Sequence, residues 1–443
     1  MNPVSIKVNL YNSSLNCIIL NKTIVIQKDK VATSRRIPPA TTNGMRNFFC
    51  CFAISVSLLI RGLPLAAQEE FIDPPSHHLT TIPFLQLTGG IIIMQAMFGE
   101  SKDTLNFILD TGSSGISLDS TAVVVLGLTA TPTDRTIRGI AGIRKVSFLY
   151  DRELHFPGLT VSHLDFHIND YSILTAVYGE RIDGIIGYSV LSRYIVKVDY
   201  DSMKISFWTK GTIRYPRGGY LLKPSINKLA SQELRVKDEQ VITSKFLYDM
   251  GAGLCLLLTK DFVNDSSFLK KKRKRFIKEG EGLGGKIDME MTVITEVKIG
   301  PYRFRNVPVF IFDDVNNVTS YPYMGGIIGN DILRRFNVIV NYAQGDIHLT
   351  PNSHYNESFD YAYSGIELYL INGVIIVGDV AKGSPGELAG LLEGDVVLAV
   401  DKNFSQNLNQ YKLTLQKAND KMIIVIRRNE EIKMIEMKVK SIL

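Results

Sequence analysis

Two aspartates stand at the ends of two similar apolar segments, and together they could carry out acid–base chemistry. Asp110 follows Phe107–Leu109, and Asp249 follows Phe246–Tyr248. A carboxylate at the end of an apolar strand is largely buried, and two buried carboxylates close together cannot both ionise, so they share one proton. Such a pair offers a base that activates water and an acid that protonates a carbonyl oxygen.

A glycine lies two positions after each aspartate. Gly112 and Gly251 have no Cβ, so they allow a tight turn and let backbone N–H groups approach the carboxylate. The residue after each glycine is small for the same reason. We therefore expect one active-site loop in each copy, made of Thr111, Gly112 and Ser113 in the first and of Met250, Gly251 and Ala252 in the second.

The similarity between the two halves extends far beyond these loops. Each aspartate is followed at nearly the same distance by an apolar-apolar-glycine sequence, Ile185–Gly187 in the first half and Ile327–Gly329 in the second. Two further pairs of glycines, Gly142 with Gly284 and Gly158 with Gly300, have the same spacing as Gly187 with Gly329. We interpret this as a duplicated domain. The alternative is a pair of β-rich lobes that share ancestry but no chemistry.

With these motifs, residues 80–350 resemble the aspartic proteases, and most closely the bacterial retropepsin-like proteins that join two such lobes to a PDZ domain. Asp110–Ser113 matches the catalytic Asp-Thr-Gly-Ser/Ala motif of that family in full. The resemblance implies that Asp110 and Asp249 are catalytic. It also implies that each apolar-apolar-glycine turn threads behind a catalytic loop and that a helix follows, over Ser189–Tyr194 and Asp331–Phe336.

The second catalytic loop departs from the family at Met250, where the resemblance implies a threonine whose hydroxyl bonds across the lobe interface. A methionine side chain can fill the space as an adaptable apolar group, but it cannot replace the hydroxyl. Two interpretations stay open: an active peptidase, or a catalytically weak or inactive peptide-binding or scaffold protein of the same fold.

Glycine clusters occupy corresponding places in the two halves, at Arg138–Gly142 and Gly280–Gly285. Such clusters between apolar runs are usually plain turns. The resemblance implies glycine-tipped β-hairpin flaps that cover the site. Both readings stay open, and we assign no catalytic role to a single residue of either cluster.

The C-terminal segment carries another set of motifs. Gly383–Pro385, Ala389–Leu391 and Gly394–Asp395 resemble the PDZ signature, and Asn407–Lys417 reads as the helix that walls a peptide groove. The resemblance implies a peptide-binding loop formed by Gly365, Ile366, Glu367 and Leu368, which would bind a C-terminal peptide or recruit substrate. A purely structural lid is the alternative.

The expected fold class is mostly β, because apolar runs such as Gly90–Phe98 and Val307–Phe312 are rich in strand-forming residues. Two pseudo-symmetric pepsin- or retropepsin-like β lobes precede the PDZ domain. We expect the following boundaries: lobe 1 at 80–212, lobe 2 at 213–350, a linker at 351–359 and the PDZ domain at 360–443.

The N-terminal residues predict export. Residues 45–67 have a basic start, an apolar run from Phe48 to Ile60 and small residues before Gln68, as in a signal peptide. The apolar run is short for a membrane span, although a retained anchor is the alternative. Residues 1–44 would then lie upstream of the true start at Met45. We expect a bacterial periplasmic or secreted protein.

Composition excludes several partners and cofactors. The excess of basic residues lies in residues 1–67, so the rest of the chain is nearly neutral and gives no support for nucleic-acid binding. Cys255 is the one cysteine after the expected cleavage site, which rules out an internal disulfide in the mature chain. The histidines show no metal-ligand spacing, so we expect no metal and no cofactor. The predicted function is cleavage of exported peptides or unfolded proteins by an aspartic endopeptidase.

Overall fold

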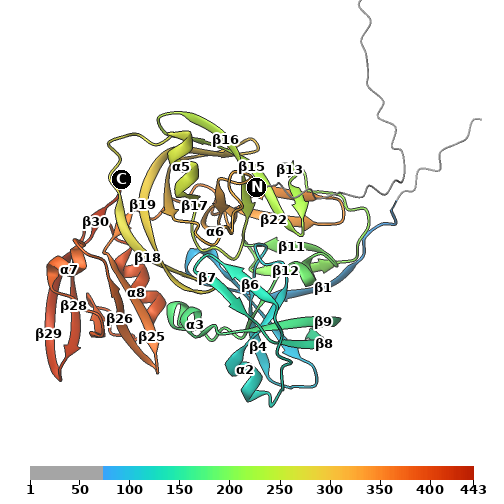
Figure 1. Ribbon diagram of the computed structural model, residues 1–443, viewed down its shortest axis with the longest axis horizontal. Helices are drawn as coiled ribbons and strands as arrows, with labels where there is room; N and C mark the ends of the chain where they lie inside the picture. Colours follow the sequence, from blue (N-terminus) through green and yellow to red (C-terminus); the bar gives the residue numbers. More distant parts are fainter. Residues whose placement is uncertain (1–72) are drawn as a thin grey trace, which may run out of the picture. The chain divides into compact units, whose positions relative to one another are not determined.

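The structure is a computed structural model that describes residues 73–443. About half of this part of the chain forms β-strands, which are joined by loops and short helices (Figure 1). The expected upstream segment at 1–44 and the expected signal peptide at 45–67 lie outside the described residues. Within residues 73–443, every helix is too short or too polar to cross a membrane.

Lobe 1 is built on a seven-stranded sheet with the order β2-β3-β4-β10-β5-β9-β8. Its central strands are apolar on both faces, as expected for strands that are covered on both sides. The elements are β2 (Leu85–Gln86), η1 (Thr88–Gly90), β3 (Ile92–Phe98), β4 (Thr104–Leu109), β5 (Ile116–Asp119), α2 (Ser120–Val125), β8 (Phe148–Phe156), β9 (Leu159–Asn169), α3 (Ser172–Tyr178), β10 (Gly184–Ile186) and α4 (Tyr188–Leu191).

Lobe 2 repeats this arrangement in an eight-stranded sheet with the order β14-β15-β16-β21-β17-β20-β19-β18. In both lobes the short strand of the apolar-apolar-glycine turn lies parallel to the strand that ends at the aspartate. The elements are β14 (Ser225–Asn227), β15 (Leu229–Lys237), β16 (Val241–Tyr248), β17 (Leu256–Thr259), α5 (Lys260–Ser266), β18 (Phe276–Gly282), β19 (Gly285–Ile299), β20 (Tyr302–Phe312), β21 (Gly326–Ile328) and α6 (Asn330–Leu333).

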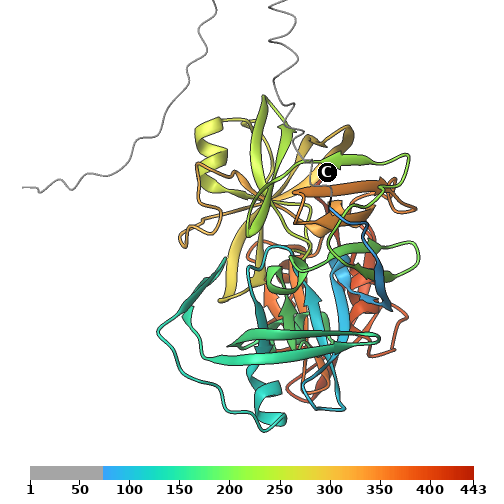
Figure 2. The same cartoon turned by 90° about the vertical axis from the view of Figure 1, so that its right-hand side faces the viewer.

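A third sheet joins the two lobes. Its order is β1-β12-β11-β22-β23-β13, and the pairing of β11 with β22 crosses from lobe 1 to lobe 2 (Figure 2). A single apolar core therefore runs through both lobes. The strands are β1 (His78–Pro83), β11 (Ile195–Asp199), β12 (Lys204–Trp208), β13 (Tyr220–Leu222), β22 (Phe336–Asn341) and β23 (Asp346–Pro351).

The C-terminal domain has its own apolar core and a five-stranded sheet ordered β25-β26-β27-β28-β29. Ser384 caps α7, Pro385 is its first residue and Gly390 ends it at φ 89°, which explains the local sequence. The elements are β24 (Ala362–Tyr363), β25 (Ile366–Ile371), β26 (Val374–Val380), α7 (Pro385–Ala389), β27 (Val396–Val400), α8 (Leu408–Leu415), β28 (Lys421–Arg428), β29 (Glu431–Lys438) and β30 (Lys440–Ser441). The predicted fold class is confirmed.

The segment between lobe 2 and the C-terminal domain, expected to be a linker at 351–359, packs against lobe 2. The Arg335 side chain donates hydrogen bonds to backbone carbonyls of this segment, including that of Glu357, and its guanidinium lies over the Phe359 ring. Phe359 itself is buried in the core shared by the lobes. These contacts attach the segment to lobe 2.

Candidate active site

The two aspartates begin equivalent turns. β4 leads into Asp110 and β16 leads into Asp249. The Asp110 N–H donates to the Ile186 carbonyl at 3.0 Å, and the Asp249 N–H donates to the Ile328 carbonyl at 3.0 Å. Each catalytic-loop candidate is therefore held by the short strand of its own lobe.

The glycine two positions after each aspartate is required because the two lobes approach each other closely at this point. The N–H groups of Gly112 and Gly251 donate to the carboxylates of Asp110 and Asp249, each at 2.7 Å. A Cβ added to Gly112 would lie 2.5 Å from the Asp249 carboxyl carbon, and one added to Gly251 would lie 2.5 Å from that of Asp110. Each aspartate thus packs against the glycine of the opposite lobe, where no other residue fits.

This arrangement places the two carboxyls close enough together for each to affect the ionisation of the other. Burial raises the pKa of Asp110 well above its ordinary value, and the neighbouring Asp249 charge raises it further. Burial also raises the pKa of Asp249, although the hydrogen bonds from Asp110 and from backbone N–H groups act in the opposite direction. The pair therefore holds one proton under conditions in which two isolated carboxyls would hold none.

Next to the carboxyls, a side chain of lobe 1 makes hydrogen bonds across the lobe interface. The Thr111 hydroxyl donates to the Tyr248 carbonyl at 2.8 Å and accepts from the Met250 N–H at 2.9 Å. Thr111 therefore crosses to the second lobe through both its donor and its acceptor functions. The Met250 side chain is fully buried and belongs to the core shared by the lobes.

The turns behind the loops are also pseudo-symmetric. The Tyr188 N–H donates to the Ser113 carbonyl at 2.9 Å, and the Asn330 N–H donates to the Ala252 carbonyl at 2.7 Å. Helices follow both turns, but α4 and α6 each start one residue before the expected position and are shorter than expected. Ser113 and Ala252 are thereby held in place by the helix that follows the turn.

The two glycine clusters form hairpins whose tips meet. Flap 1 consists of β6 (Thr136–Gly139) and β7 (Gly142–Lys145), and flap 2 of β18 and the start of β19. The Ala141 N–H donates to the Leu283 carbonyl at 3.2 Å, and Arg144 donates to the Gly284 carbonyl at 2.9 Å. The tips are thus in direct contact, which favours flaps over plain turns.

Each flap tip reaches the opposite lobe. Ile140 of flap 1 belongs to an apolar cluster with Ala252 of the second loop. Leu283 of flap 2 belongs to a cluster with Ile185 of lobe 1 and with Tyr178, the last residue of α3. Tyr178 is a residue that the sequence analysis missed, and nothing in its local sequence marks it.

The predicted peptide-binding residues of the C-terminal domain lie away from the aspartates. Gly365, at φ 70°, precedes β25, and Ile366, Glu367 and Leu368 are the first residues of that strand. The Ile366 and Leu368 side chains are buried in the core of their own domain. Glu367 instead forms an ion pair with Lys278 of flap 2 at 2.8 Å.

In the part of the chain that the structure describes, no group of three or more His, Cys, Asp or Glu side chains is arranged so that it could hold a metal ion. Cys255 is buried, and its thiol donates to the Asp331 carboxylate at 3.0 Å. Burial and this neighbouring charge raise the pKa of the thiol well above its ordinary value, so the cysteine is unsuited to act as a nucleophile.

Comparison with known families detects the same type of domain in each of the two lobes. The sequence model for aspartyl proteases matches residues 94–190 and again residues 233–332, so each match contains one aspartate and the turn behind it. The sequence model for PDZ domains matches residues 376–428. No curated protein matches the chain.

Proposed function

Because the chain carries two aspartyl protease lobes followed by a PDZ domain, we propose that it is an aspartic endopeptidase that cleaves exported peptides or unfolded proteins. One observation carries the proposal: Asp110 and Asp249 lie next to each other in equivalent turns. Each accepts a hydrogen bond from the N–H of the glycine in its own turn, and the opposite aspartate leaves no room for a side chain on that glycine.

The pair supplies both functions that peptide hydrolysis needs. The ionised carboxylate takes a proton from water, which attacks the carbonyl carbon of the scissile bond. The protonated carboxyl gives its proton to the carbonyl oxygen, so the charge that develops there is neutralised. The C–N bond of the tetrahedral adduct then breaks, the leaving nitrogen takes the proton that the first carboxylate received from water, and the hydroxyl proton of the adduct returns to the other carboxylate. No covalent bond forms between substrate and protein, and the raised pKa of both aspartates keeps the shared proton available in mildly acidic solution.

The flaps favour an extended substrate. The tips of the two hairpins meet. Each hairpin has an edge strand, because β18 ends its sheet and β6 and β7 form a sheet of their own, and an extended chain can pair with such an edge. A folded domain does not present such a segment, whereas an unfolded protein or a peptide does. The PDZ domain would recruit the substrate, and the signal-like residues 45–67 support action outside the cytoplasm.

The alternative function is peptide binding without cleavage, which the substitution at Met250 favours. The structure offers a reason to prefer the enzyme. Of the two loops, the first alone has a hydroxyl, that of Thr111, which bonds across the lobe interface. The hydrogen bonds from the N–H groups of Gly112 and Gly251 to their aspartates nevertheless have the same length in both lobes. Methionine at this position is therefore compatible with a symmetric pair of carboxyls.

The test is an assay of the purified chain on a mixed peptide library, with products identified by mass spectrometry. The wild type is expected to cleave, and Asp110→Asn is expected to be inactive because it removes the shared-proton pair. Asp134→Asn is the matched control, since the Asp134 side chain is 97% exposed and its one ion pair, with Lys145 at the base of flap 1, lies on the surface. An unchanged product pattern in Asp110→Asn would overturn the proposal in favour of a different catalytic group.

A further inference from the structure

The PDZ domain has a surface suited to an added strand. β25 is the edge strand of its sheet, and α8 packs alongside it. In peptide-binding domains of this kind an extended peptide pairs with the free edge while the adjacent helix forms the second wall. Whatever occupies the space between β25 and α8 therefore competes with a peptide.

In this structure that space is taken by α3 of lobe 1, which packs against β25 (Figure 1). The Lys412 ammonium of α8 donates to the Val177 carbonyl in the last turn of α3 at 2.7 Å. Gly179, directly after α3, lies so close to α8 that a Cβ added there would be 3.3 Å from the Leu408 Cβ. Both walls of the PDZ groove, β25 and α8, therefore contact α3.

The same face of the PDZ domain holds flap 2. Glu367 pairs with Lys278 at 2.8 Å. The Tyr369 hydroxyl donates to the Glu281 carboxylate at 2.5 Å. The Tyr363 hydroxyl donates to the backbone carbonyl of Ile277 in flap 2 at 2.9 Å. Three residues on one face of the PDZ domain, at β24 and β25, therefore fasten one strand of the flap.

α3 also reaches the active site. Tyr178 packs in the same apolar cluster as Leu283 at the tip of flap 2. Burial raises the pKa of its hydroxyl, and so do the negative charges of Glu281, Asp249 and Asp110, which places this side chain within the electrostatic reach of the catalytic pair. α3 thus connects the PDZ groove, the flap tip and the candidate active site.

We propose that the PDZ domain binds α3 as an internal ligand and thereby clamps flap 2 closed over the active site. An extended peptide that pairs with β25 displaces α3, breaks the contacts from Glu367 and Tyr369 and releases the flap. Because the two events are linked, substrate entry under the flap also weakens the grip of the PDZ domain on α3. The effect on turnover rests on the proposed peptidase function.

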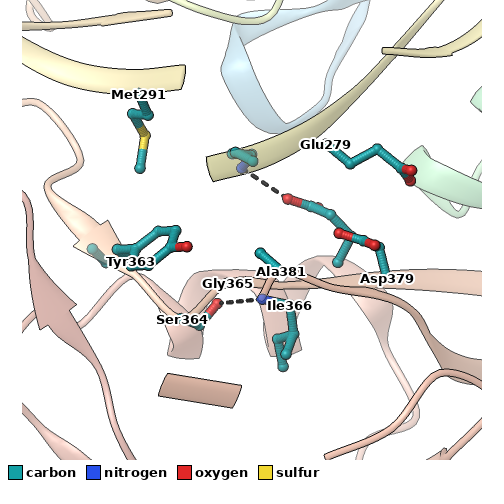
Figure 3. A pocket seen from close by; sticks show the side chains of 11 residues that line it. Glu279, Met291, Tyr363, Ser364, Gly365, Ile366, Asp379 and Ala381 are labelled. Carbon is teal, nitrogen blue, oxygen red and sulfur yellow. Dashed lines mark hydrogen bonds and ion pairs between the residues drawn. The ribbon is translucent and has the colours of Figure 1, made fainter. Parts of the chain in front are cut away.

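The ligand that fits this groove is an internal extended segment rather than a free C-terminus. The small cavity beside Gly365, about 40 Å³, is lined by three carboxylates, those of Glu279, Glu367 and Asp379 (Figure 3). The one ammonium that lines it, Lys278, is paired with Glu367, and Lys286 of flap 2 is paired with Glu279. Asp379 is therefore the lining carboxylate that no ion pair neutralises. A C-terminal carboxylate would meet net negative charge there.

A reversible disulfide tests the clamp. In the full chain we would combine Gly179→Cys with Leu408→Cys, because a Cβ to Cβ distance near 3.3 Å is close to the range of about 3.5–4.5 Å that disulfides adopt. Gly179 has φ 69°, so cysteine there is strained, but the oxidised and reduced forms share that strain. Each single variant, treated in the same way, is the control, and peptide mapping verifies the bridge.

Two readouts separate the clamp from the peptidase activity. Oxidation is expected to lower turnover of a peptide substrate by about tenfold or more, with recovery on reduction. Hydrogen exchange of amides 276–285 is measured separately in an Asp110→Asn background, which does not cut the probe. There, a pool of C-terminally amidated decapeptides is expected to speed exchange in the reduced form and to leave the oxidised form unchanged.

The clamp is overturned if oxidised and reduced forms exchange these flap amides at the same rate with and without the decapeptides. Slower exchange in both forms on adding the decapeptides also overturns it, because the peptides then bind under the flap only. A wild type without any turnover refutes the proposed peptidase function instead, and the exchange measurement still decides whether the clamp exists.

Discussion

Replacing Met250 by threonine introduces the residue found at this position in the aspartic proteases that the chain resembles, and the structure predicts that this harms the protein. The Met250 side chain is fully buried in the core shared by both lobes. The partner hydroxyl, that of Thr111, already has a donor and an acceptor in the opposite loop. A threonine at this position would therefore gain no bond to the Thr111 hydroxyl, and it would leave part of the space filled by the methionine side chain empty.

The magnitude follows from two opposing contributions. Truncating a buried methionine to a small residue costs about 2–5 kcal/mol, because apolar contacts are lost and a cavity remains. A new threonine hydroxyl recovers on the order of 1 kcal/mol for each hydrogen bond that it makes, with two available by symmetry with Thr111. With both hydrogen bonds made, we therefore expect Met250→Thr to lower the free energy of unfolding by up to about 3 kcal/mol.

The measurement combines denaturant unfolding with peptide turnover. Met250→Leu is the matched control, since leucine keeps most of the buried apolar volume and should cost less than about 1.5 kcal/mol. We expect Met250→Thr to lose stability without any gain in turnover number. A simultaneous rise in stability and in turnover would refute the reasoning and show that methionine only weakens the interface.

Three further predictions follow from the site. Thr111→Val should lower both stability and turnover, because it leaves the Tyr248 carbonyl and the Met250 N–H without their partner, whereas Thr111→Ser should keep most of both. If Thr111→Ser loses as much stability and turnover as Thr111→Val, loss of the hydroxyl is not the cause of the effect. Asp110→Asn should be more stable than the wild type, and its advantage in melting temperature should grow as pH rises from about 4. The folded pKa of Asp110 is raised, so the folded wild type holds more protons than the unfolded chain and loses stability as pH rises through that pKa. An advantage that shrinks with pH would contradict this sign. Amidating the C-termini of peptides that bind the PDZ domain should leave their affinity unchanged, and a marked loss would restore a carboxylate-binding role to Gly365.

The duplicated motifs allowed the fold and the pairing of the two aspartates to be predicted from the sequence. The reason is that each motif is a local turn whose residue types are set by its own geometry. Gly112 and Gly251 leave room for the opposite aspartate, and the apolar strand before each aspartate specifies a buried sheet. Two copies of such a turn predict one site where they meet.

The contacts that surround the site could not be predicted in this way. The ion pair of Lys278 with Glu367 and the contact of α3 with β25 join segments that are far apart in the chain and have no repeated partner. The same is true of Arg273, which lies in a basic run but forms an ion pair with the buried Asp238. From the sequence alone, charged residues of this kind are interpreted as solvent-exposed, because their partners become neighbours only in the tertiary structure.

The most direct test of the central claim is a mutant cycle on the two aspartates. Asp110→Asn, Asp249→Asn and the double variant are compared in turnover of a single peptide substrate, with circular dichroism to verify folding. Because the carboxyls share one proton, each single variant should lose nearly all activity and the double variant should be scarcely worse. Substantial activity in either single variant, or losses that multiply in the double variant, would contradict a pair that acts as one unit.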